Sequence, residues 1–260
     1  MKNFLKNIVP PILAKLIQKK PKYGFFGNYK TWQEAQADSI GYDSSVILEK
    51  VKNSLLKVKN GEAVYERDSV LFDKVEYSWP VLAGLLWIAS QKENSLNVLD
   101  FGGSLGSCYF QNLNFLKHLK NLKWNIVEQE SFVKCGKKFF EDDNLKFFHN
   151  TETCLSSNKI DVLLTSSSLQ YLENPYFLIK TATDLNFDYI IIDRTPFLEN
   201  KEKITVQKVN PQIYDASYPA WLINEEKFVR IIKDKYDLIA DWKSSFGTIN
   251  LRGFIFKRIK

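Results

Sequence analysis

Apolar runs alternate with segments of helical spacing from about residue 97 onward in this chain of 260 residues. The apolar runs predict strands at residues 97–101, 123–128, 145–148, 160–165 and 188–193. The segments of helical spacing predict helices near residues 106–120, 130–141 and 175–184. Strands that alternate with helices pair in parallel through crossover helices, so this half of the chain predicts a doubly wound α/β sheet.

The end of the chain has a different pattern. A helix near 225–234 precedes two strand-like runs, 236–242 and 249–257, which are joined by a turn containing Gly247. Two such runs across a short turn predict an antiparallel hairpin rather than another parallel unit. The expected fold is therefore a Rossmann-like, mostly parallel sheet that closes with an antiparallel C-terminal hairpin.

The first 95 residues contain little of this alternation. Thr31 and Glu34 form a capping box, residues 43–60 have helical spacing, and Pro80 stands in the first turn of an apolar helix. The aromatic and glycine-rich residues 23–29 are expected to form a loop or docking surface. We expect three parts: a basic amphipathic arm (1–30), a helical extension or lid (31–95), and a core (96–260) with an insertion at about 200–223.

Charge is uneven along the chain. The net charge is +6, but residues 1–30 contain seven lysines and no acid, so the remainder is close to neutral. A neutral body does not favour nucleic acid, whereas the arm could lie on an anionic membrane or an assembly partner, or pack on its own domain. Three cysteines and two histidines without metal-ligand spacing indicate a reducing, cytoplasmic setting and no zinc site.

The strand at 97–101 ends beside a glycine-rich turn. Asp100 is followed by Gly102, Gly103 and Gly106, which predicts a strand, a tight turn and a helix start. Alone, such a turn could hold a dinucleotide or S-adenosylmethionine, or could be purely structural, with Asp100 capping the next helix.

A carboxylate ends the second strand of the predicted core. Glu128 stands where an acid can accept hydrogen bonds from the two hydroxyls of a ribose. Glu130 takes this position if the strand register differs by two residues.

Several segments, in order, resemble a family of methyltransferases met in bacterial surface-polysaccharide and O-antigen gene neighbourhoods. They are Pro10-Pro11, Thr31-Trp32, Gly41-Tyr42, and the segments 65–69, 100–106, 166–172, 192–196 and 216–221. The resemblance implies a class I fold, S-adenosylmethionine as methyl donor, and a sugar or glycan precursor as acceptor. Ser104 departs from the general glycine pattern of such loops, which leaves the path of the backbone there open.

Strand ends supply the other candidates. Ser166 and Tyr171 follow the fourth strand, and Asp193 and Arg194 end the fifth, at the sheet edge where doubly wound folds bind ligands. We expect Ser166 to face the cofactor, and Tyr171 and Arg194 to face the acceptor. Asp193 and Arg194 could instead form a structural ion pair.

Methyl transfer to a hydroxyl needs a base, and we expect Asp193 in this role, with Asp68 as second choice. Arg67 could bind the methionine carboxylate of the cofactor or an acidic group of the acceptor. Tyr218 and Trp221 could stack on a sugar ring or anchor the insertion. The alternatives are a small-molecule or protein methyltransferase, a non-catalytic scaffold in polysaccharide assembly, or a dehydrogenase.

Overall fold

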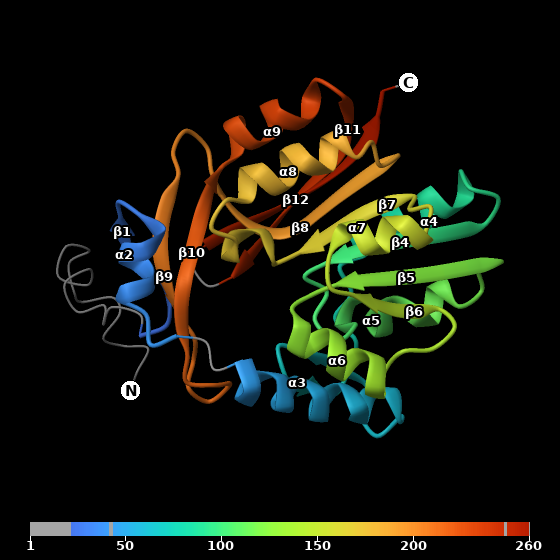
Figure 1. Cartoon of the computed structure of the whole chain (residues 1–260), viewed down its shortest axis with the longest axis horizontal. Helices are drawn as coiled ribbons and strands as arrows, with labels where there is room; N and C mark the ends of the chain where they lie inside the picture. The colour runs from blue at the N-terminus through green and yellow to red at the C-terminus, as the bar shows by residue number, and fades with distance from the viewer. Residues whose placement is uncertain (1–21, 42–43, 247–248, 260) are drawn as a thin grey trace, which may run out of the picture.

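A computed structural model describes residues 22–41, 44–246 and 249–259 (Figure 1). Most of the expected basic arm, residues 1–21, lies outside the described residues. Within the described part of the chain, no helix combines the length and apolar character needed to cross a membrane.

The core is one twisted sheet with the order β6–β5–β4–β7–β8–β12–β11. Its strands are β4 (Ser95–Phe101), β5 (Asn121–Val127), β6 (Leu145–Phe148), β7 (Val162–Ser166), β8 (Tyr189–Leu198), β11 (Tyr236–Phe246) and β12 (Ile249–Arg258). The strands from β6 to β8 are parallel, whereas β12 runs antiparallel to both β8 and β11. The predicted Rossmann-like sheet with an antiparallel C-terminal hairpin is confirmed.

Helices cover both faces of this sheet (Figure 1). One hydrophobic core joins it to α4 (Trp79–Ser90), α5 (Ser107–Leu116) and α6 (Glu130–Phe139), with α3 (Ser44–Lys59) packed outside α5 and α6. The core of the other face includes α7 (Thr151–Ser157), α8 (Pro175–Asp184) and α9 (Glu225–Lys233). The apolar strand runs are buried from both sides, as parallel sheets require.

Three further strands continue the sheet beyond β8, and we call this antiparallel part the second sheet. Strand β9 (Lys203–Lys208) pairs antiparallel with β1 (Gly24–Tyr29) and β10 (Ser217–Asn224), and the end of β10 pairs with β8. The interpretation of residues 23–29 as a loop was wrong, because residues 24–29 form the strand β1. Its partner β9 lies in the segment that we expected to be an insertion. Thr31 caps α2 (Trp32–Ala37) as predicted, because its side chain accepts the Glu34 N–H. The Glu34 carboxylate accepts the N–H of Lys30 rather than that of Thr31, so the Thr31 half of the capping box is confirmed.

The segment between α3 and α4 is not helical. It forms a hairpin of β2 (Tyr65–Arg67) and β3 (Val70–Phe72), whose turn residues Asp68 and Ser69 have φ values of 52° and 66°. The helical extension expected over residues 31–95 therefore contains a β-hairpin, and this hairpin contacts α3 and α5.

Candidate functional site

The turn between β4 and α5 has the conformation that the glycine pattern predicts. Gly102 and Gly106 have positive φ values of 71° and 106°. Ser104 also takes a left-handed φ of 55°, so the chain follows a glycine-like path despite the serine. A side chain at Gly102 would meet the Ser168 Cβ at 2.5 Å, which explains why glycine is needed there.

The glycine turn packs directly against the carboxyl group of Asp100. Asp100 is 1% exposed, and its Oδ2 accepts a hydrogen bond from Trp124 Nε1 at 3.0 Å. A Cβ at Gly103 would lie 2.6 Å from the Asp100 Cγ, so the turn closes directly over the carboxyl. Burial raises the pKa of Asp100 to about 7. Asp100 does not cap α5, whose N-cap is Gly106 and makes no side-chain cap bond.

Glu128 is the carboxylate that contacts the turn. Its Oε1 accepts the Ser104 N–H at 3.3 Å, and its Oε2 accepts the Gln129 N–H at 2.7 Å. Burial raises the pKa of Glu128. Glu130, the alternative in the other register, is exposed on α6 and pairs with Lys134 at 2.5 Å. The structure thus brings Glu128, and not Glu130, to the glycine turn.

Ser166, the last residue of β7, contacts Asp193 and Arg194 of β8. The expectation that Asp193 and Arg194 end their strand was wrong, because β8 continues to Leu198; they lie where its pairing with β7 ends. Asp193 is 3% exposed; its Oδ2 accepts Ser166 Oγ at 2.8 Å and its Oδ1 accepts Trp242 Nε1 at 3.2 Å. Arg194 Nε lies 3.5 Å from the Asp193 Oδ2 and donates to Ser166 Oγ at 3.2 Å. Although burial alone lowers the pKa of Arg194, the charges of Asp193 and Asp68 raise it.

Backbone strain gathers at the same edge. Ser167 and Arg194 have positive φ values of 60° and 46°, in a region that non-glycine residues adopt rarely. The N–H of Ser167 donates to the Asp193 carbonyl at 3.0 Å, which holds the residue after β7 against β8. Such local strain is a frequent feature of binding and catalytic sites.

Glu66 of the hairpin is a further candidate site residue, which the sequence analysis did not select. It is 1% exposed and accepts hydrogen bonds from the hydroxyl of Ser107, the first residue of α5, and from the Ser69 N–H at 3.1 Å. Burial raises the pKa of Glu66 to about 6. The segment 65–69, which carries part of the family resemblance, contains Glu66. The sequence analysis selected its neighbours Arg67 and Asp68 from this segment.

Arg67 points to a different environment from Glu66, because neighbouring residues of a strand face opposite sides. Arg67 Nη2 pairs with Glu76 Oε2 at 2.9 Å, and the guanidinium lies 5.4 Å from the centre of the Phe72 ring. Among the described residues, Arg67 has no hydrogen bond or ion pair with the glycine turn. The structure therefore does not bring Arg67 to the predicted cofactor residues.

Tyr171 and Tyr218 do come together. Their rings meet edge to face at a centroid distance of 5.1 Å, and the Tyr171 hydroxyl donates to Gln207 Oε1 at 2.8 Å. Tyr214 forms a side-chain hydrogen bond with Tyr218. Gln207 and Tyr214 were missed because β9 and its connection to β10 showed no clear strand pattern.

Trp221 lies apart from Tyr218, three residues away on the opposite face of β10. Its ring stacks on Trp32 of α2 at 6.4 Å, and its Nε1 donates to the Glu173 carbonyl at 3.2 Å. The contact with Trp32 anchors α2 on the second sheet. Trp221 therefore fits the anchoring role that was the alternative to stacking on a sugar ring.

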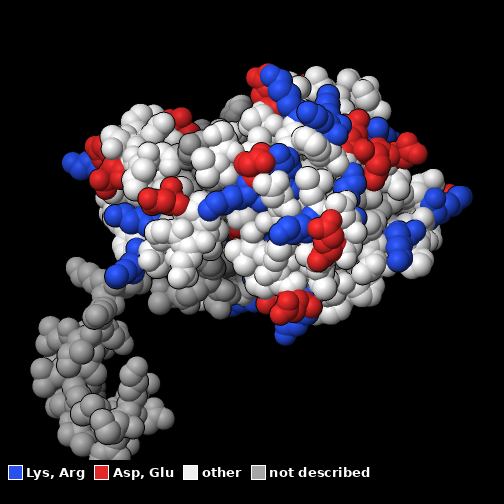
Figure 2. Space-filling view, turned by 90° about the horizontal axis from the view of Figure 1, so that it is seen from below, with Lys and Arg blue, Asp and Glu red and all other residues white. Residues whose placement is uncertain are grey.

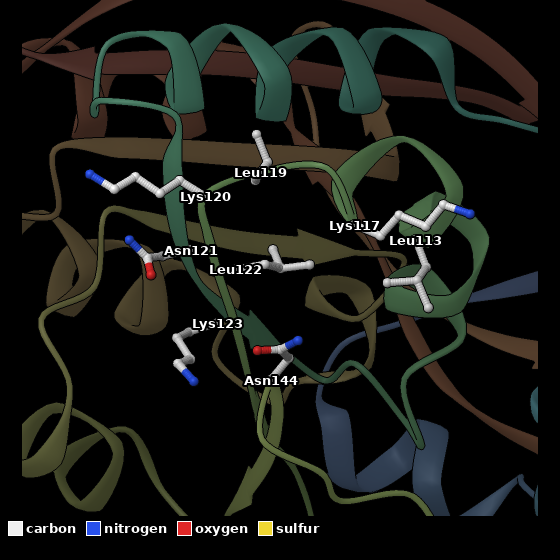
Figure 3. Close-up of a pocket in the computed structure, with 8 residues that line it drawn as sticks. All are labelled: Leu113, Lys117, Leu119, Lys120, Asn121, Leu122, Lys123 and Asn144. Carbon is white, nitrogen blue, oxygen red and sulfur yellow. The ribbon is translucent and has the colours of Figure 1, made fainter.

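A hollow elsewhere on the surface is separate from these residues. It has a volume of about 180 Å³ and lies where α5 ends and β5 begins, at the opposite edge of the sheet from the glycine turn (Figure 3). The amino groups of Lys117, Lys120 and Lys123 point away from one another there. They do not converge on a common ligand position.

Charges are mixed on the face seen from below (Figure 2). Among the described residues drawn there, basic and acidic side chains are interspersed with uncharged ones, and no continuous basic patch covers that face. The described residues also contain no group of three or more His, Cys, Asp and Glu side chains that could hold a metal ion.

The sheet order and the turn at its carboxyl edge together define a Rossmann-like α/β fold with an antiparallel C-terminal hairpin. No known family model matches the chain, and no curated protein matches it. Solved structures of similar fold include the N-terminal domain of EvdMO1, crystallised in the presence of SAH and D-fucose. It is 13% identical, with a TM-score of 0.49, and the match covers 84% of this chain and 98% of that one.

Two further similar structures are methyltransferases. Magnesium protoporphyrin IX methyltransferase from Synechocystis PCC 6803, with bound SAH, is 15% identical (TM-score 0.49; 69% of this chain and 81% of that one). The CcbJ methyltransferase from Streptomyces caelestis is 10% identical (TM-score 0.47; 70% and 90%). None of these similarities assigns a ligand or a reaction to this chain.

Proposed function

We propose that this chain is an S-adenosylmethionine-dependent methyltransferase that methylates a hydroxyl group of a sugar or surface-glycan precursor. The observation that carries the proposal is the contact between Glu128 and the glycine turn at the carboxyl edge of the central strands. Doubly wound sheets bind ligands at this edge, and an acid after the second strand is placed to hold a ribose.

The residues at this edge fit such a cofactor. Each carboxylate oxygen of Glu128 accepts one backbone N–H and keeps a further lone pair for a ribose hydroxyl. Asp100 and Glu66 are carboxyl groups buried beside the turn and the first turn of α5. Burial disfavours their charged forms, and a cation bound beside them would favour these forms again. This suits a cofactor whose methionine part carries both a sulfonium and an ammonium group.

S-adenosylmethionine supplies an electrophilic methyl group: a bond forms from the acceptor oxygen to the methyl carbon as the carbon–sulfur bond breaks with its electrons going to sulfur. The protein must align the acceptor and take its hydroxyl proton. We propose that Ser166, at the end of β7, and Arg194, in β8, border the transferred methyl group.

Asp68 is the base that we propose, in place of Asp193. The Asp193 carboxylate is held by Ser166 and Trp242 and lies beside Arg194, so it positions these groups and is shielded from solvent. Asp68 is exposed in the hairpin turn, and its charge acts on Arg194 and on Tyr171. It can therefore reach an acceptor and release a proton to water.

The test is transfer of labelled methyl groups from S-adenosylmethionine to glycan pools. We expect Asp68→Asn to lower kcat by about 10²- to 10⁴-fold while leaving cofactor affinity unchanged. Asp193→Asn should lower kcat and also raise KM, because Arg194 and Ser166 lose their common partner. Full turnover by Asp68→Asn would remove it from the role of base. Absence of transfer to any sugar or glycan, with cofactor bound, would exclude the proposed acceptor.

A further inference from the structure

Strand β8 contains a β-bulge at the proposed methyl-transfer edge. Two steps along β12, from residue 252 to 254, face three steps along β8, from 195 to 192. Asp193 and Arg194 therefore lie together opposite the single residue Gly253, and Arg194 takes a left-handed φ of 46°. A bulge bends its strand and redirects the side chains on it. The bulge therefore sets the directions of the two charged side chains at this edge.

Trp242 of the C-terminal hairpin reaches this bulge. It pairs with Gly253 across β11 and β12, and a Cβ on Gly253 would lie 2.1 Å from the Trp242 Cε2. The indole therefore occupies the space that any side chain at Gly253 would fill. Its Nε1 donates to the Asp193 Oδ1 at 3.2 Å, so the ring crosses β12 to reach β8. A strand position without a side chain is what lets β11 contact the bulge.

The two oxygens of the Asp193 carboxylate have different kinds of partner. Oδ1 accepts Ser78 Oγ at 3.4 Å in addition to the Trp242 N–H. Ser78 is the N-cap residue of α4, but its side chain makes no cap bond. Oδ2 faces the two proposed site residues, Ser166 and Arg194. Because the two oxygens turn as one rigid group, the donors at Oδ1 fix where Oδ2 lies.

We propose that Trp242 is a positioning residue of the methyl-transfer edge: its N–H holds the Asp193 carboxylate in the rotation that orients Ser166 and Arg194. This inference rests on the proposed function, to which it adds a part for the C-terminal hairpin. Of the two donors at Oδ1, the indole N–H is the closer, and it belongs to a rigid ring packed on Gly253. Hydrogen bonds to a charged group are stronger than those between neutral groups, so loss of this N–H loosens the carboxylate.

Nuclear magnetic resonance of the Arg194 Nε–H group tests the positioning without any acceptor. The resonance is observed in the isotope-labelled full chain and assigned through Arg194→Lys. Trp242→Phe keeps an aromatic ring over Gly253 but removes the N–H, and we expect it to shift and broaden the Arg194 resonance. Trp87→Phe is the matched control, because Trp87 is also partly exposed and packs on Tyr189 at the other end of β8. Equal changes in the two variants, or no change in either, would overturn the proposal.

Kinetics separate positioning from cofactor binding. Trp242→Phe should lower kcat for labelled methyl transfer about tenfold to a hundredfold, because transfer depends steeply on alignment, and should keep the affinity for S-adenosylhomocysteine within about twofold. Trp87→Phe should leave both quantities unchanged. Because Trp242 acts through Asp193, adding Trp242→Phe to Asp193→Ala should lower kcat by less than about twofold further. A double variant whose loss equals the product of the two single losses would contradict this role.

Gly253→Ala tests the same geometry from β12. It keeps the Trp242 N–H but places a Cβ 2.1 Å from the indole, so the ring must move relative to Asp193. We expect the same change of the Arg194 resonance as in Trp242→Phe. An unchanged resonance in Gly253→Ala with the circular dichroism spectrum of the wild type would refute the inference. Failure of the wild type to bind S-adenosylhomocysteine would contradict the proposed function separately, and the Arg194 resonance would still report on Trp242.

Discussion

Replacing Asp100 by asparagine should change how the stability of this protein depends on pH. Asp100 is 1% exposed, and burial raises its pKa to about 7 from an ordinary value of 3.8. Asparagine has nearly the same shape and keeps an oxygen that can accept the Trp124 N–H, but it does not titrate. The substitution therefore removes the cost of the buried negative charge and keeps the hydrogen bond.

The sign and size follow from proton linkage. Between about pH 4 and pH 7 the folded protein keeps the proton of Asp100 while the unfolded chain loses it, so stability falls as pH rises through this window. A shift of about three pKa units changes the free energy of unfolding by roughly 4 kcal/mol over the whole pH range in which Asp100 titrates. Between pH 5 and pH 8, we expect the free energy of unfolding of the wild type to fall by roughly 3 kcal/mol relative to that of Asp100→Asn.

Urea-induced unfolding followed by circular dichroism at pH 5, 6, 7 and 8 measures this difference. The comparison between variants matters, because other groups titrate equally in both proteins. Asp143→Asn is the matched control and should follow the wild type at every pH. If the difference in free energy of unfolding between wild type and Asp100→Asn stays constant within about 1 kcal/mol from pH 5 to pH 8, burial does not dominate the pKa of Asp100.

Four other substitutions test local features. Ser104→Gly should stabilise the protein by about 0.5–1 kcal/mol and Ser104→Val should destabilise it by about 1–2 kcal/mol, because φ is positive there; thermal unfolding would show whether the order holds. Trp32→Ala should cost about 2–4 kcal/mol and increase hydrogen exchange in β1 and β9, whereas Trp79→Ala, at a side chain 60% exposed, should cost less than about 1 kcal/mol. Equal costs would contradict the anchoring role of Trp32.

The sequence was sufficient to predict the core strands and their parallel arrangement. Strands buried on both faces are continuous apolar runs, such as residues 189–192, and helices between them have a different period. The second sheet was harder to predict because β1 pairs with β9, about 180 residues later, and neither strand has a strict alternation. Strand pairing between distant segments leaves little local signal.

The candidate site residues divide in the same way, into those on the core strands and those on other parts of the chain. Glu128, Ser166 and Arg194 were predicted to share one edge because parallel strands present their carboxyl ends together, and they stay candidates for the site. Arg194 lies inside β8, at the point where the pairing with β7 ends. Arg67 and Trp221 were separated from the site by strand alternation, since a shift of one residue reverses the direction of a side chain. Glu66 and Gln207 reach the edge from the hairpin and the second sheet, whose positions the sequence did not indicate.

The central claim is that the carboxyl edge of the sheet binds S-adenosylmethionine through the glycine turn and Glu128. Calorimetric titration of S-adenosylhomocysteine into wild type, Glu128→Gln and Glu130→Gln tests it most directly. We predict that the wild type and Glu130→Gln bind equally, and that Glu128→Gln binds about tenfold to a hundredfold more weakly, because charge-assisted bonds to the ribose are lost. No binding by the wild type at high micromolar concentration, or equal binding by all three proteins, would contradict the claim.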